Sequence, residues 1–570
     1  MAFTRIALLS TALLTLTACG KAQSTEQKID KSLPSWCISG GPIYTAIDTA
    51  PKASVVAVRH GKITYVGYEK TPKNWCRKNA GVRAKKIKLR GDAMYPGFTD
   101  GHGHLLGIGL REMTLNLEGT ASIDELVQRL KTVVKDTPQG ETIYGRGWIE
   151  THWPEGRFPT RQDLDAVSPN HPVILERADG HAIVVNSKAI QMAGISRSTK
   201  IPFGGDILKD DKGELSGMLI DNAGELVSEL ISELTPKQRK AAYIKGAEIY
   251  ASRGWTNIHS MSVNPADVPM IEQLASDGKI KIRVYNSIDY LSGNSASIDP
   301  DDPGDDSKRV ITRAIKMYSD GALGSRGAAL LAPYSDDGEN TGLMTLKKDQ
   351  AISIFTSALR NGTQVNTHAI GDRANKTILD WYAEAFAAVP PEQRVIAEPR
   401  WRIEHSQILD IADIPRFAAM GVIPSMQPSH AIGDLHFAVD RLGEGRLAGG
   451  YAWRSLIDSG SIIVGGTDAP VEAGDPRIEF YAATRRKDLK GFSGPGWNPE
   501  QRVTAQEALK MFTAWPAYAS YQEKKIGTIE VGKWADFTIF EDDIMAADGK
   551  TILNTETRMT IVGGKVAYKR

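Results

Sequence analysis

Short stretches of apolar and β-branched residues, separated by glycines and polar residues, mark both ends of this 570-residue chain. Near the start, two such stretches flank the turn-like His60-Gly61-Lys62, and a third alternates basic and apolar side chains as an edge strand does. The strands that this pattern predicts are residues 54–59, 63–67, 85–89, 526–533, 535–540 and 559–568. Since both ends share one pattern, the simplest arrangement is a small β-sandwich domain built from both termini.

The middle of the chain alternates amphipathic helices with short apolar stretches. Ser122 and Glu125 form a capping-box pattern ahead of apolar residues at helical spacing, and Thr235 with Pro236 begins another helix. One expected helix begins at residue 122, and two others cover residues 235–254 and 349–360. The expected strands cover residues 255–258, 364–367, 421–424 and 461–465. Repeated helix and strand units over roughly 420 residues predict the α/β fold class, as a (β/α)₈ TIM barrel with insertions.

These patterns divide the chain into five parts. We expect a signal peptide over residues 1–18, a tether over 19–35, the barrel with a substrate-side insertion over 96–518, and the β-sandwich domain over 36–95 and 519–570. In a barrel of this kind, the active residues gather at the carboxyl ends of the strands.

The first residues have the features of an export signal. Arg5 supplies a positive charge, residues 6–16 are apolar, and small residues precede Cys19. Leu16-Thr17-Ala18-Cys19 resembles the lipobox of bacterial lipoproteins, which implies lipidation of Cys19; ordinary cleavage just before the cysteine is the alternative. Gly20 stands where an aspartate would favour the inner membrane, so we expect a periplasmic protein anchored to the outer membrane. No later stretch approaches about 20 uninterrupted apolar residues, so this anchor is the membrane contact that we expect.

The chain contains three cysteines. If Cys19 is lipidated, Cys37 and Cys76 remain as a pair in an exported protein, where they can form a disulfide. Two separate buried thiols are the alternative, and the sequence does not decide between them.

The overall charge argues against nucleic acid as a partner. The formal net charge is +1 at pH 7, and residues of both signs are spread along the chain. We therefore expect a small-molecule substrate and no nucleic-acid partner, and the sequence leaves the oligomeric state open.

The segment from Met94 to His104 contains the first candidate chemistry. His102 and His104 follow a short apolar run, and side chains at i and i+2 of an extended backbone point to the same side. Such a pair can bind a borderline-soft cation such as Zn²⁺ through its ring nitrogens. The pattern alone is weak, because most such pairs are surface or structural histidines, and it needs further ligands.

Further candidates stand at the ends of other expected strands. They are Lys316, His368, His405 and Asp468. Four histidines, a lysine and an aspartate are what a hydrolytic centre of two metals needs, because neutral imidazoles bind metal and a buried lysine of lowered pKa can react with CO₂ to form a bridging carbamate. The aspartate can bind metal and also move protons. We expect one or two divalent ions, with Zn²⁺ as the first choice.

These residues lie in motifs that together resemble the amidohydrolase superfamily, and within it the amidohydrolase family 3 branch, which includes N-substituted formamide deformylases. The resemblance extends from about Cys37 to Tyr568. The motifs are Asp100-Gly-His-Gly-His104, Lys316 with Ser319-Asp-Gly-Ala-Leu-Gly-Ser-Arg326, Thr367-His-Ala-Ile-Gly-Asp-Arg-Ala374, Ile403-Glu-His405, Met426-Gln-Pro428, Gly466-Thr-Asp468 and Gly532-Lys-Trp-Ala-Asp536. The resemblance implies a barrel whose metal ligands are His102 and His104 from the first strand, Lys316 from the fourth, His368 from the fifth, His405 from the sixth and Asp468 from the eighth.

The function that follows is metal-dependent hydrolysis of a C–N bond in an amide, formamide, carbamate or cyclic amide, and not in a peptide. Water activated by metal would attack the carbonyl carbon, and Asp468 would carry its proton to the leaving group. Esters and lactones suit the same machinery. The alternatives from other classes are a lipid-anchored binding protein without catalysis, and a metal-dependent enzyme that acts on phosphate esters or double bonds.

Other residues are candidates for contact with the substrate. We expect His181, His259 and His430 near it, with Trp148 and Trp153 as weaker candidates, and we expect His436 to be a surface or structural residue. Selectivity depends on loops whose side-chain positions one sequence does not fix, so the substrate itself is not predicted.

Overall fold

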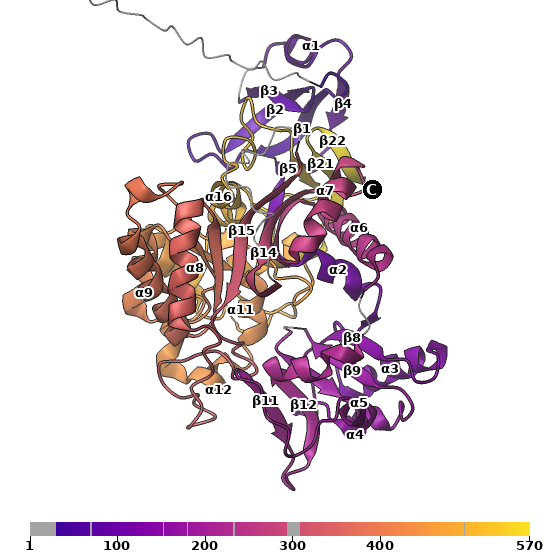
Figure 1. Ribbon diagram of the computed structural model, residues 1–570. Helices are drawn as coiled ribbons and strands as arrows, with labels where there is room; N and C mark the ends of the chain where they lie inside the picture. The colour runs from indigo at the N-terminus through magenta and orange to yellow at the C-terminus, as the bar shows by residue number, and fades with distance from the viewer. Residues whose placement is uncertain are drawn as a thin grey trace, which may run out of the picture.

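The computed structural model describes residues 30–68, 71–151, 153–178, 180–231, 234–292, 308–494 and 496–570. Cys19 and the expected signal peptide lie outside the described residues, so lipidation and export stay predictions. Figure 1 shows three parts: a sheet of strands from both termini at the top, the barrel in the centre, and an inserted domain at the bottom.

Eight parallel strands form the central sheet, in the order β19-β18-β17-β16-β15-β14-β13-β6. They are β6 (Phe98–Gly103), β13 (Trp255–Val263), β14 (Arg283–Asp289), β15 (Val310–Tyr318), β16 (Gln364–Ala369), β17 (Arg402–His405), β18 (Ile423–Met426) and β19 (Val464–Gly465). Each strand pairs with the next along the chain, and helices lie between them, so the predicted TIM-barrel-like α/β fold is confirmed.

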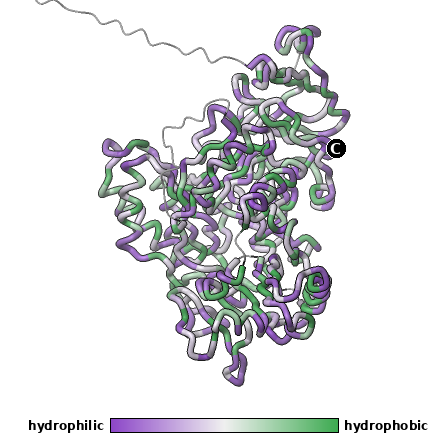
Figure 2. Tube along the Cα trace, turned by 45° about the vertical axis from the view of Figure 1, so that its right-hand side comes forward, coloured by the Kyte–Doolittle hydropathy of each residue, from purple (hydrophilic) through white to green (hydrophobic). Residues whose placement is uncertain are grey.

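Helices connect the barrel strands and cover their outer side. They are α2 (Leu105–Arg111), α6 (Pro236–Arg253), α7 (Val268–Ser276), α8 (Lys348–Asn361), α9 (Asp372–Ala388), α10 (Ile414–Met420), α11 (Pro428–Asp434), α12 (Ala438–Leu442), α13 (Trp453–Asp458), α14 (Pro476–Arg485), α15 (Ala505–Met511) and α16 (Ala514–Ala519). Helix α6 begins with a capping box of Thr235 and Gln238 and ends at Gly254, whose φ is 106°. Figure 2 shows hydrophobic and hydrophilic residues interspersed along the Cα trace.

Strands from both ends of the chain share a second sheet, which we call the terminal sheet. Its order is β22-β21-β20-β5-β1-β2-β3, with β4 paired to β1. The strands are β1 (Trp36–Tyr44), β2 (Lys52–Arg59), β3 (Lys62–Gly67), β4 (Lys85–Lys88), β5 (Ala93–Pro96), β20 (Phe537–Phe540), β21 (Thr557–Val562) and β22 (Lys565–Lys569), and helix α17 (Gly549–Asn554) lies between β20 and β21. Both termini therefore build one sheet, whereas a sandwich of two facing sheets is not confirmed and the domain boundaries stay predictions.

Two expected strands near the C-terminus differ from the prediction. Residues 526–533 form turns and irregular backbone, because Gly527 and Gly532 have φ of 90° and 96°, which interrupts an extended chain. The stretch 559–568 is divided between β21 and β22 by a turn at Gly563 and Gly564.

The chain between β6 and β13 contributes six strands that form a third sheet. We call this sheet and its helices the inserted domain. Its elements are β7 (Leu115–Asn116), α3 (Ile123–Asp136), β8 (Ile143–Trp148), α4 (Arg161–Asp165), β9 (Val173–Arg177), β10 (Ala182–Val185), α5 (Ser187–Met192), β11 (Gly205–Lys209) and β12 (Leu215–Asp221). Ser122 caps α3 by accepting a hydrogen bond from the Glu125 backbone N–H, as its sequence predicts. Trp148 and Trp153 are buried in the core of this domain, so the structure does not support the prediction that they contact the substrate.

A disulfide joins Cys37 in β1 to Cys76 in helix α1 (Trp75–Ala80) and fixes this helix to the terminal sheet. Within the described ranges, no helix combines the length and the apolar character needed to cross a bilayer.

Candidate metal centre

Six side chains from strands far apart in the sequence meet at the carboxyl end of the barrel. They are His102 in β6, His104 directly after it, Lys316 in β15, His368 in β16, His405 at the end of β17, and Asp468 shortly after β19. These are the first, fourth, fifth, sixth and eighth strands, the positions that the resemblance implied. All six side chains line one cavity of about 1040 Å³.

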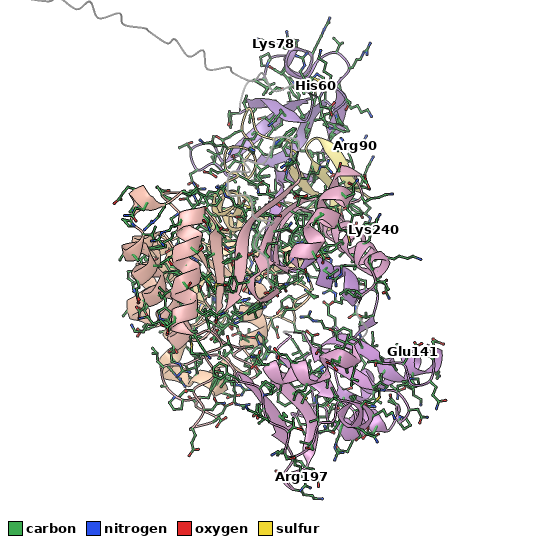
Figure 3. All side chains as sticks on the ribbon, viewed as in Figure 1. His60, Lys78, Arg90, Glu141, Arg197 and Lys240 are labelled. Carbon is green, nitrogen blue, oxygen red and sulfur yellow. A yellow bond between two sulfur atoms is a disulfide. The ribbon has the colours of Figure 1, made fainter. Side chains whose placement is uncertain are left out.

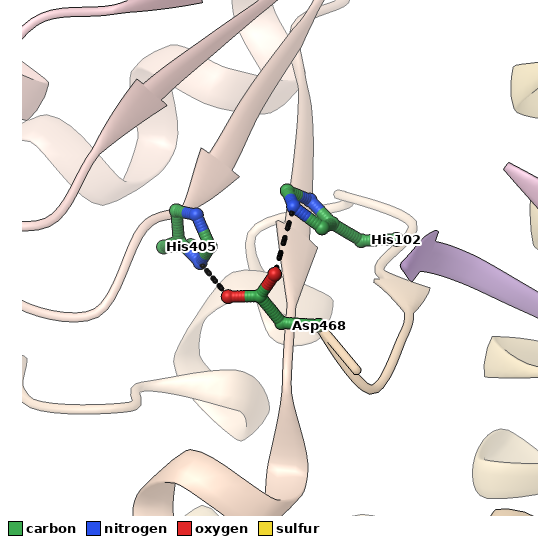
Figure 4. Close-up of side chains that lie close together, drawn as sticks. All are labelled: His102, His405 and Asp468. Atoms are coloured by element: carbon green, nitrogen blue, oxygen red, sulfur yellow. Dashed lines mark ion pairs between the residues drawn. The ribbon is translucent and has the colours of Figure 1, made fainter. Parts of the chain in front are cut away.

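Asp468 lies at the centre of the histidines. Its Oδ1 is 3.3 Å from His102 Nε2 and 2.9 Å from His104 Nε2, and its Oδ2 is 4.0 Å from His405 Nδ1 (Figure 4). The His405 ring lies 4.8 Å from the His102 ring and 4.6 Å from the His368 ring, measured between centroids. One carboxylate therefore faces three imidazoles, and a fourth lies next to them.

The backbone holds two of these side chains in a conformation that residues with a Cβ atom rarely adopt. Asp468 has φ of 57° and His405 has φ of 76°. Asp468 also donates its backbone N–H to the carbonyl oxygen of His102 at 2.6 Å, which ties the last barrel strand to the first. Each such conformation costs about 1–3 kcal/mol and persists where the surrounding structure fixes it, which is typical of functional sites.

Lys316 is almost completely buried among the ligands. Its Nζ lies 4.2 Å from the centroid of the Tyr318 ring. Burial lowers the pKa of Lys316 to about 8, although the charges of Glu404 and Asp468 oppose this shift. A lysine with a lowered pKa contains more of the neutral amine at physiological pH, and the neutral amine is the form that reacts with CO₂.

Burial favours the neutral form of three ligand histidines. It lowers the pKa of His104, and it lowers the pKa of His368 and His405 well below the ordinary value. Burial would also lower the pKa of His102, but the charges of Asp468 and Glu404 raise it above the ordinary value. Burial would raise the pKa of Asp468, but the charge of His102 and the hydrogen bond from His104 hold it well below the usual range. Neutral imidazoles and a charged carboxylate are the ligand forms that divalent metals require.

The carboxylate of Glu404 fixes the orientation of His102. Glu404 Oε2 accepts a hydrogen bond from His102 Nδ1 at 2.6 Å, and Glu404 Oε1 lies 2.7 Å from Arg402 Nε, with all three side chains fully buried. Burial raises the pKa of Glu404, but Arg402 and His102 more than offset this effect and hold that pKa well below its usual range. Because Nδ1 donates to the carboxylate, Nε2 of His102 is the nitrogen that faces the centre.

The donor set fits a divalent metal. The Nε2 atoms of His102 and His368 are buried and make no hydrogen bond to any residue in the described part of the chain. One nitrogen or oxygen atom from each of His102, His405 and Asp468 lies within 4.8 Å of the other two. Two imidazole nitrogens and a carboxylate oxygen are typical zinc ligands, and histidines with buried nitrogens that lack hydrogen bonds are the expected partners of an ion.

The three histidines expected near the substrate lie at different depths. His181 and His430 line the cavity, and His430 Nε2 is 3.8 Å from Asp468 Oδ2. His259 is fully buried in the barrel interior, where its Nδ1 accepts a hydrogen bond from Arg402 at 2.9 Å. The structure therefore does not support substrate contact for His259, which lies in the layer that packs beneath the ligands.

His436 lies in the cavity wall, although the sequence predicts a surface or structural role. Its ring stacks on Phe492 with 4.9 Å between centroids, and its Nε2 lies 3.1 Å from Asp488 Oδ2. The inserted domain forms the opposite wall, where Arg177 is paired with Glu150 at 2.8 Å. The cavity thus lies between the barrel and the inserted domain.

Three buried residues beside the ligands were not predicted from the sequence. Glu404 and Gln427 orient ligand rings, since Gln427 Oε1 accepts a hydrogen bond from His405 Nδ1 at 2.8 Å, whereas Asp320 Oδ1 lies 3.4 Å from His368 Nε2 without a hydrogen bond. Burial raises the pKa of Asp320 to about 7 even though backbone N–H groups donate to it. Each residue lies in a motif that also contains or adjoins a ligand, and this is the signal that could have identified it, because ligand histidines usually bond to a nearby carboxylate or amide.

Comparison with known proteins identifies the family. A family model described as the Amidohydrolase family matches residues 85–568. The chain belongs to this family. The Bacillus subtilis protein YtcJ is 32% identical over 548 residues, which cover 93% of this chain and 99% of that protein. The N-substituted formamide deformylase of Arthrobacter pascens is 26% identical over 538 residues, which cover 91% of this chain and 95% of that protein.

The solved structures agree with this assignment. A metal-dependent hydrolase from Pyrococcus horikoshii, described as uncharacterized, superimposes with a TM-score of 0.70 and 26% identity, over 90% of this chain and 99% of that chain. The predicted branch of the amidohydrolase superfamily is therefore confirmed, and with it a metal-dependent hydrolase in general terms.

Proposed function

We propose that this amidohydrolase cleaves the C–N bond of an amide, formamide, carbamate or cyclic amide in a small molecule, with Asp468 as the group that takes and returns the proton. The observation that carries the proposal is the meeting of Asp468 with His102 and His405 at the carboxyl end of the barrel. The relative named N-substituted formamide deformylase supports the choice of a C–N bond.

The metal in this proposal is Zn²⁺, as one or two ions. The residues that would hold it are His102, His104, His368, His405 and Asp468, with Lys316 as a further ligand once it has reacted with CO₂ to form a carbamate. When bound, the metal supplies a water of lowered pKa and a Lewis acid for the substrate carbonyl.

Asp468 suits proton transfer because its two oxygens face different groups. Oδ1 faces His102 and His104, whereas Oδ2 faces His405 and His430 at 4.0 and 3.8 Å. Because its pKa is held below the usual range, Asp468 is charged at neutral pH and can accept a proton from the attacking water. It can then return this proton to the leaving nitrogen.

His430 and His181 are the proposed substrate-binding residues. Gln407 Nε2 donates to His430 Nδ1 at 2.9 Å, which leaves Nε2 as the N–H donor of the neutral ring on the side of Asp468. His181 Nδ1 donates to Asp221 Oδ1 at 2.6 Å, and the ring lies 5.6 Å from that of His368. The two histidines thus lie beside different ligands, in positions to contact different ends of a substrate.

The test is Asp468→Asn, measured on a panel of N-acyl and N-formyl amines, cyclic amides, esters and lactones. Removal of a general base typically costs about 10²–10⁴-fold in turnover. If the wild-type protein turns over amides faster than esters, the result supports C–N cleavage. Faster turnover of esters or lactones supports an ester or lactone hydrolase. Near-normal turnover of Asp468→Asn with metal bound would refute the role of Asp468.

A matched control accompanies this variant. Asp413→Asn also removes a buried carboxylate, but Asp413 pairs with Arg416 at 2.7 Å on α10 and does not line the cavity. Its turnover is expected to stay within a few-fold of the wild-type value. Metal analysis of both variants separates loss of metal from loss of the proton carrier.

We also propose export to the periplasm with lipidation at Cys19 and an outer-membrane anchor. The Cys37–Cys76 disulfide supports an oxidising compartment, because disulfides form and persist there and are rare in the bacterial cytosol. Mass spectrometry of the mature N-terminus tests the proposal, and an unmodified Cys19 would contradict it.

A further inference from the structure

The segment 73–90 of the terminal sheet carries a dense group of basic side chains. It contains eight lysines and arginines and no aspartate or glutamate. All eight are exposed; they are Lys73, Arg77, Lys78, Arg83, Lys85, Lys86, Lys88 and Arg90, and we call them the basic patch. The formal net charge of the whole chain is only +1, so the residues outside the basic patch have a net negative charge. The overall net charge therefore does not reveal that the positive charges gather in this segment.

The basic patch forms no ion pair with the carboxylates that the structure describes. Among the residues that the structure describes, none of the eight has a carboxylate within ion-pair distance, which is 4.0 Å. Elsewhere on the surface, exposed cations such as Arg157 and Lys348 pair with Asp163 and Glu384 at 2.8 and 2.9 Å. A positive field of this size at a protein surface attracts an anionic surface.

The basic patch has a fixed shape. Its first part is on α1, which the Cys37–Cys76 disulfide holds to β1, and its second part is on β4, which pairs with β1 in parallel. A short loop of residues 81–84 joins the two elements, so they lie next to each other at the top of Figure 1. Lys78 and Arg90, labelled in Figure 3, lie at this same end of the molecule.

An apolar side chain projects from the middle of the basic patch. Val82, in the loop between α1 and β4, is 75% exposed. A single exposed aliphatic side chain is ordinary on a protein surface, but one that stands among cations can enter the boundary between lipid headgroups and acyl chains when those cations bind the headgroups. The charge alone would suit any polyanion, whereas Val82 adds an apolar contact that a bilayer provides.

The N-terminal segment leaves the fold beside the basic patch. The backbone N–H of Lys85 donates to the carbonyl oxygen of Ser35 at 3.0 Å, and Lys85 Nζ lies 5.9 Å from the Trp36 ring. Cys19 precedes Ser35 by sixteen residues, which span at most about 55 Å when fully extended. A lipid at Cys19 would therefore keep this face within reach of a bilayer.

We propose that the basic patch docks on the surface of a bilayer that contains anionic phospholipids, with Val82 entering the headgroup region. The cavity is lined by residues of the barrel and of the inserted domain. In Figure 1 the inserted domain lies on the opposite side of the barrel from the terminal sheet. Docking through the terminal sheet thus turns the cavity away from the bilayer, toward water-soluble substrates. This inference concerns membrane orientation and does not depend on the hydrolytic reaction.

The experiment measures binding of the full chain to vesicles of phosphatidylcholine alone and of phosphatidylcholine with 30% phosphatidylglycerol. The patch variant carries Lys73→Gln, Lys78→Gln, Arg83→Gln and Lys86→Gln. The control variant carries Lys131→Gln, Lys135→Gln, Lys237→Gln and Lys240→Gln on α3 and α6, which are also exposed and bring the same charge change. All chains have the same N-terminal segment, so its contribution cancels in the comparison.

A basic side chain near an anionic bilayer raises the partition coefficient by about fivefold, so the patch variant is expected to bind anionic vesicles several hundredfold more weakly. Wild-type binding should fall steeply between 0.05 and 0.5 M salt, and the control variant should follow the wild type. Val82→Ser should weaken binding a few-fold at every salt concentration, because an apolar contact is not screened.

Lysine acetylation read by mass spectrometry locates the contact. Lys78, Lys85 and Lys86 are expected to be protected in the presence of anionic vesicles, whereas Lys131 and Lys240 react as they do without vesicles. Equal losses of binding in the patch and control variants would overturn the proposal, as would binding that ignores phosphatidylglycerol. Patch-dependent binding to a short DNA duplex without binding to vesicles would also overturn it. A circular-dichroism spectrum and a thermal unfolding midpoint equal to those of the wild type show that the patch variant is folded.

Discussion

Glu404→Gln is the substitution that tests how the protein orients its metal ligands. The carboxylate lies between two cationic or donor groups, with Oε2 at 2.6 Å from His102 Nδ1 and 3.0 Å from Arg402 Nη2, and Oε1 at 2.7 Å from Arg402 Nε. Glutamine keeps the shape but removes the charge, and its amide N–H₂ would face another donor. The His102 ring then loses its preferred orientation and part of its basicity.

The magnitude follows from the burial of this group. Loss of a carboxylate that orients a ligand histidine lowers metal affinity about 10–100-fold, which corresponds to about 1.4–2.8 kcal/mol. We expect the upper part of this range, because the side chains of His102 and Glu404 are both 0% exposed and water cannot replace the lost acceptor. Arg402 keeps the Gly101 carbonyl and Ser425 Oγ at 2.6 and 2.7 Å, so the barrel is expected to stay folded.

The assay is a zinc titration of metal-free protein against a chromophoric chelator, with circular dichroism as a check of folding. Glu479→Gln is the matched control: Glu479 is 1% exposed and accepts a hydrogen bond from the Ser429 backbone at 3.0 Å, but does not touch a ligand histidine. Burial raises the pKa of Glu479 well above the ordinary value, and because Glu479 touches no ligand, the zinc affinity of the Glu479→Gln protein should not change. A folded Glu404→Gln protein that binds zinc as tightly as the wild type would refute the reasoning.

Two further predictions concern Lys316 and the disulfide. With the pKa of Lys316 lowered from 10.5 to about 8, its neutral fraction should rise about fiftyfold between pH 6 and pH 8, so the reactivation of metal-free protein by zinc and dissolved CO₂ should accelerate over this range. Lys316→Ala should abolish the CO₂ dependence, and equal rates at both pH values would contradict a carbamate. Cys37→Ser with Cys76→Ser opens a loop of 39 residues and should lower the free energy of local opening of α1 by up to about 4 kcal/mol, measured by hydrogen exchange. Hydrolysis should be unaffected, and unchanged protection of α1 would show that packing alone holds the helix.

The ligands could be predicted because each ends a short apolar strand, and the carboxyl ends of parallel strands meet at one place. How deep each side chain lies within the barrel could not be predicted in the same way. His259 and His405 both lie in buried strands, yet one points into the layer beneath the site and the other into the cavity. Which layer a side chain enters depends on the tilt and stagger of the strands, and these are properties of the closed barrel rather than of a local pattern.

The terminal sheet shows the same limit on a larger scale. Alternating residues predicted most of its strands, but the pairing of β5 with β20 joins segments from opposite ends of the chain. No local pattern specifies such a partner. The role of Glu404 was missed for a related reason: His405 has φ of 76°, which interrupts the strand alternation, so Glu404 and His405 both lie beside His102 although they are neighbours in the chain.

The hydrogen bond from Asp468 to the His102 carbonyl joins the two edges of the barrel sheet at the point where the ligands meet. His104 and Asp468 lie 364 residues apart in the chain, so the ligand set is incomplete until the eighth strand has been synthesised and has reached the first. Uptake of the proposed metal would therefore be a late event in maturation, and an ion held by these residues would join the edges that otherwise separate first. Removal of the ion should make this seam the place where a protease first enters the barrel.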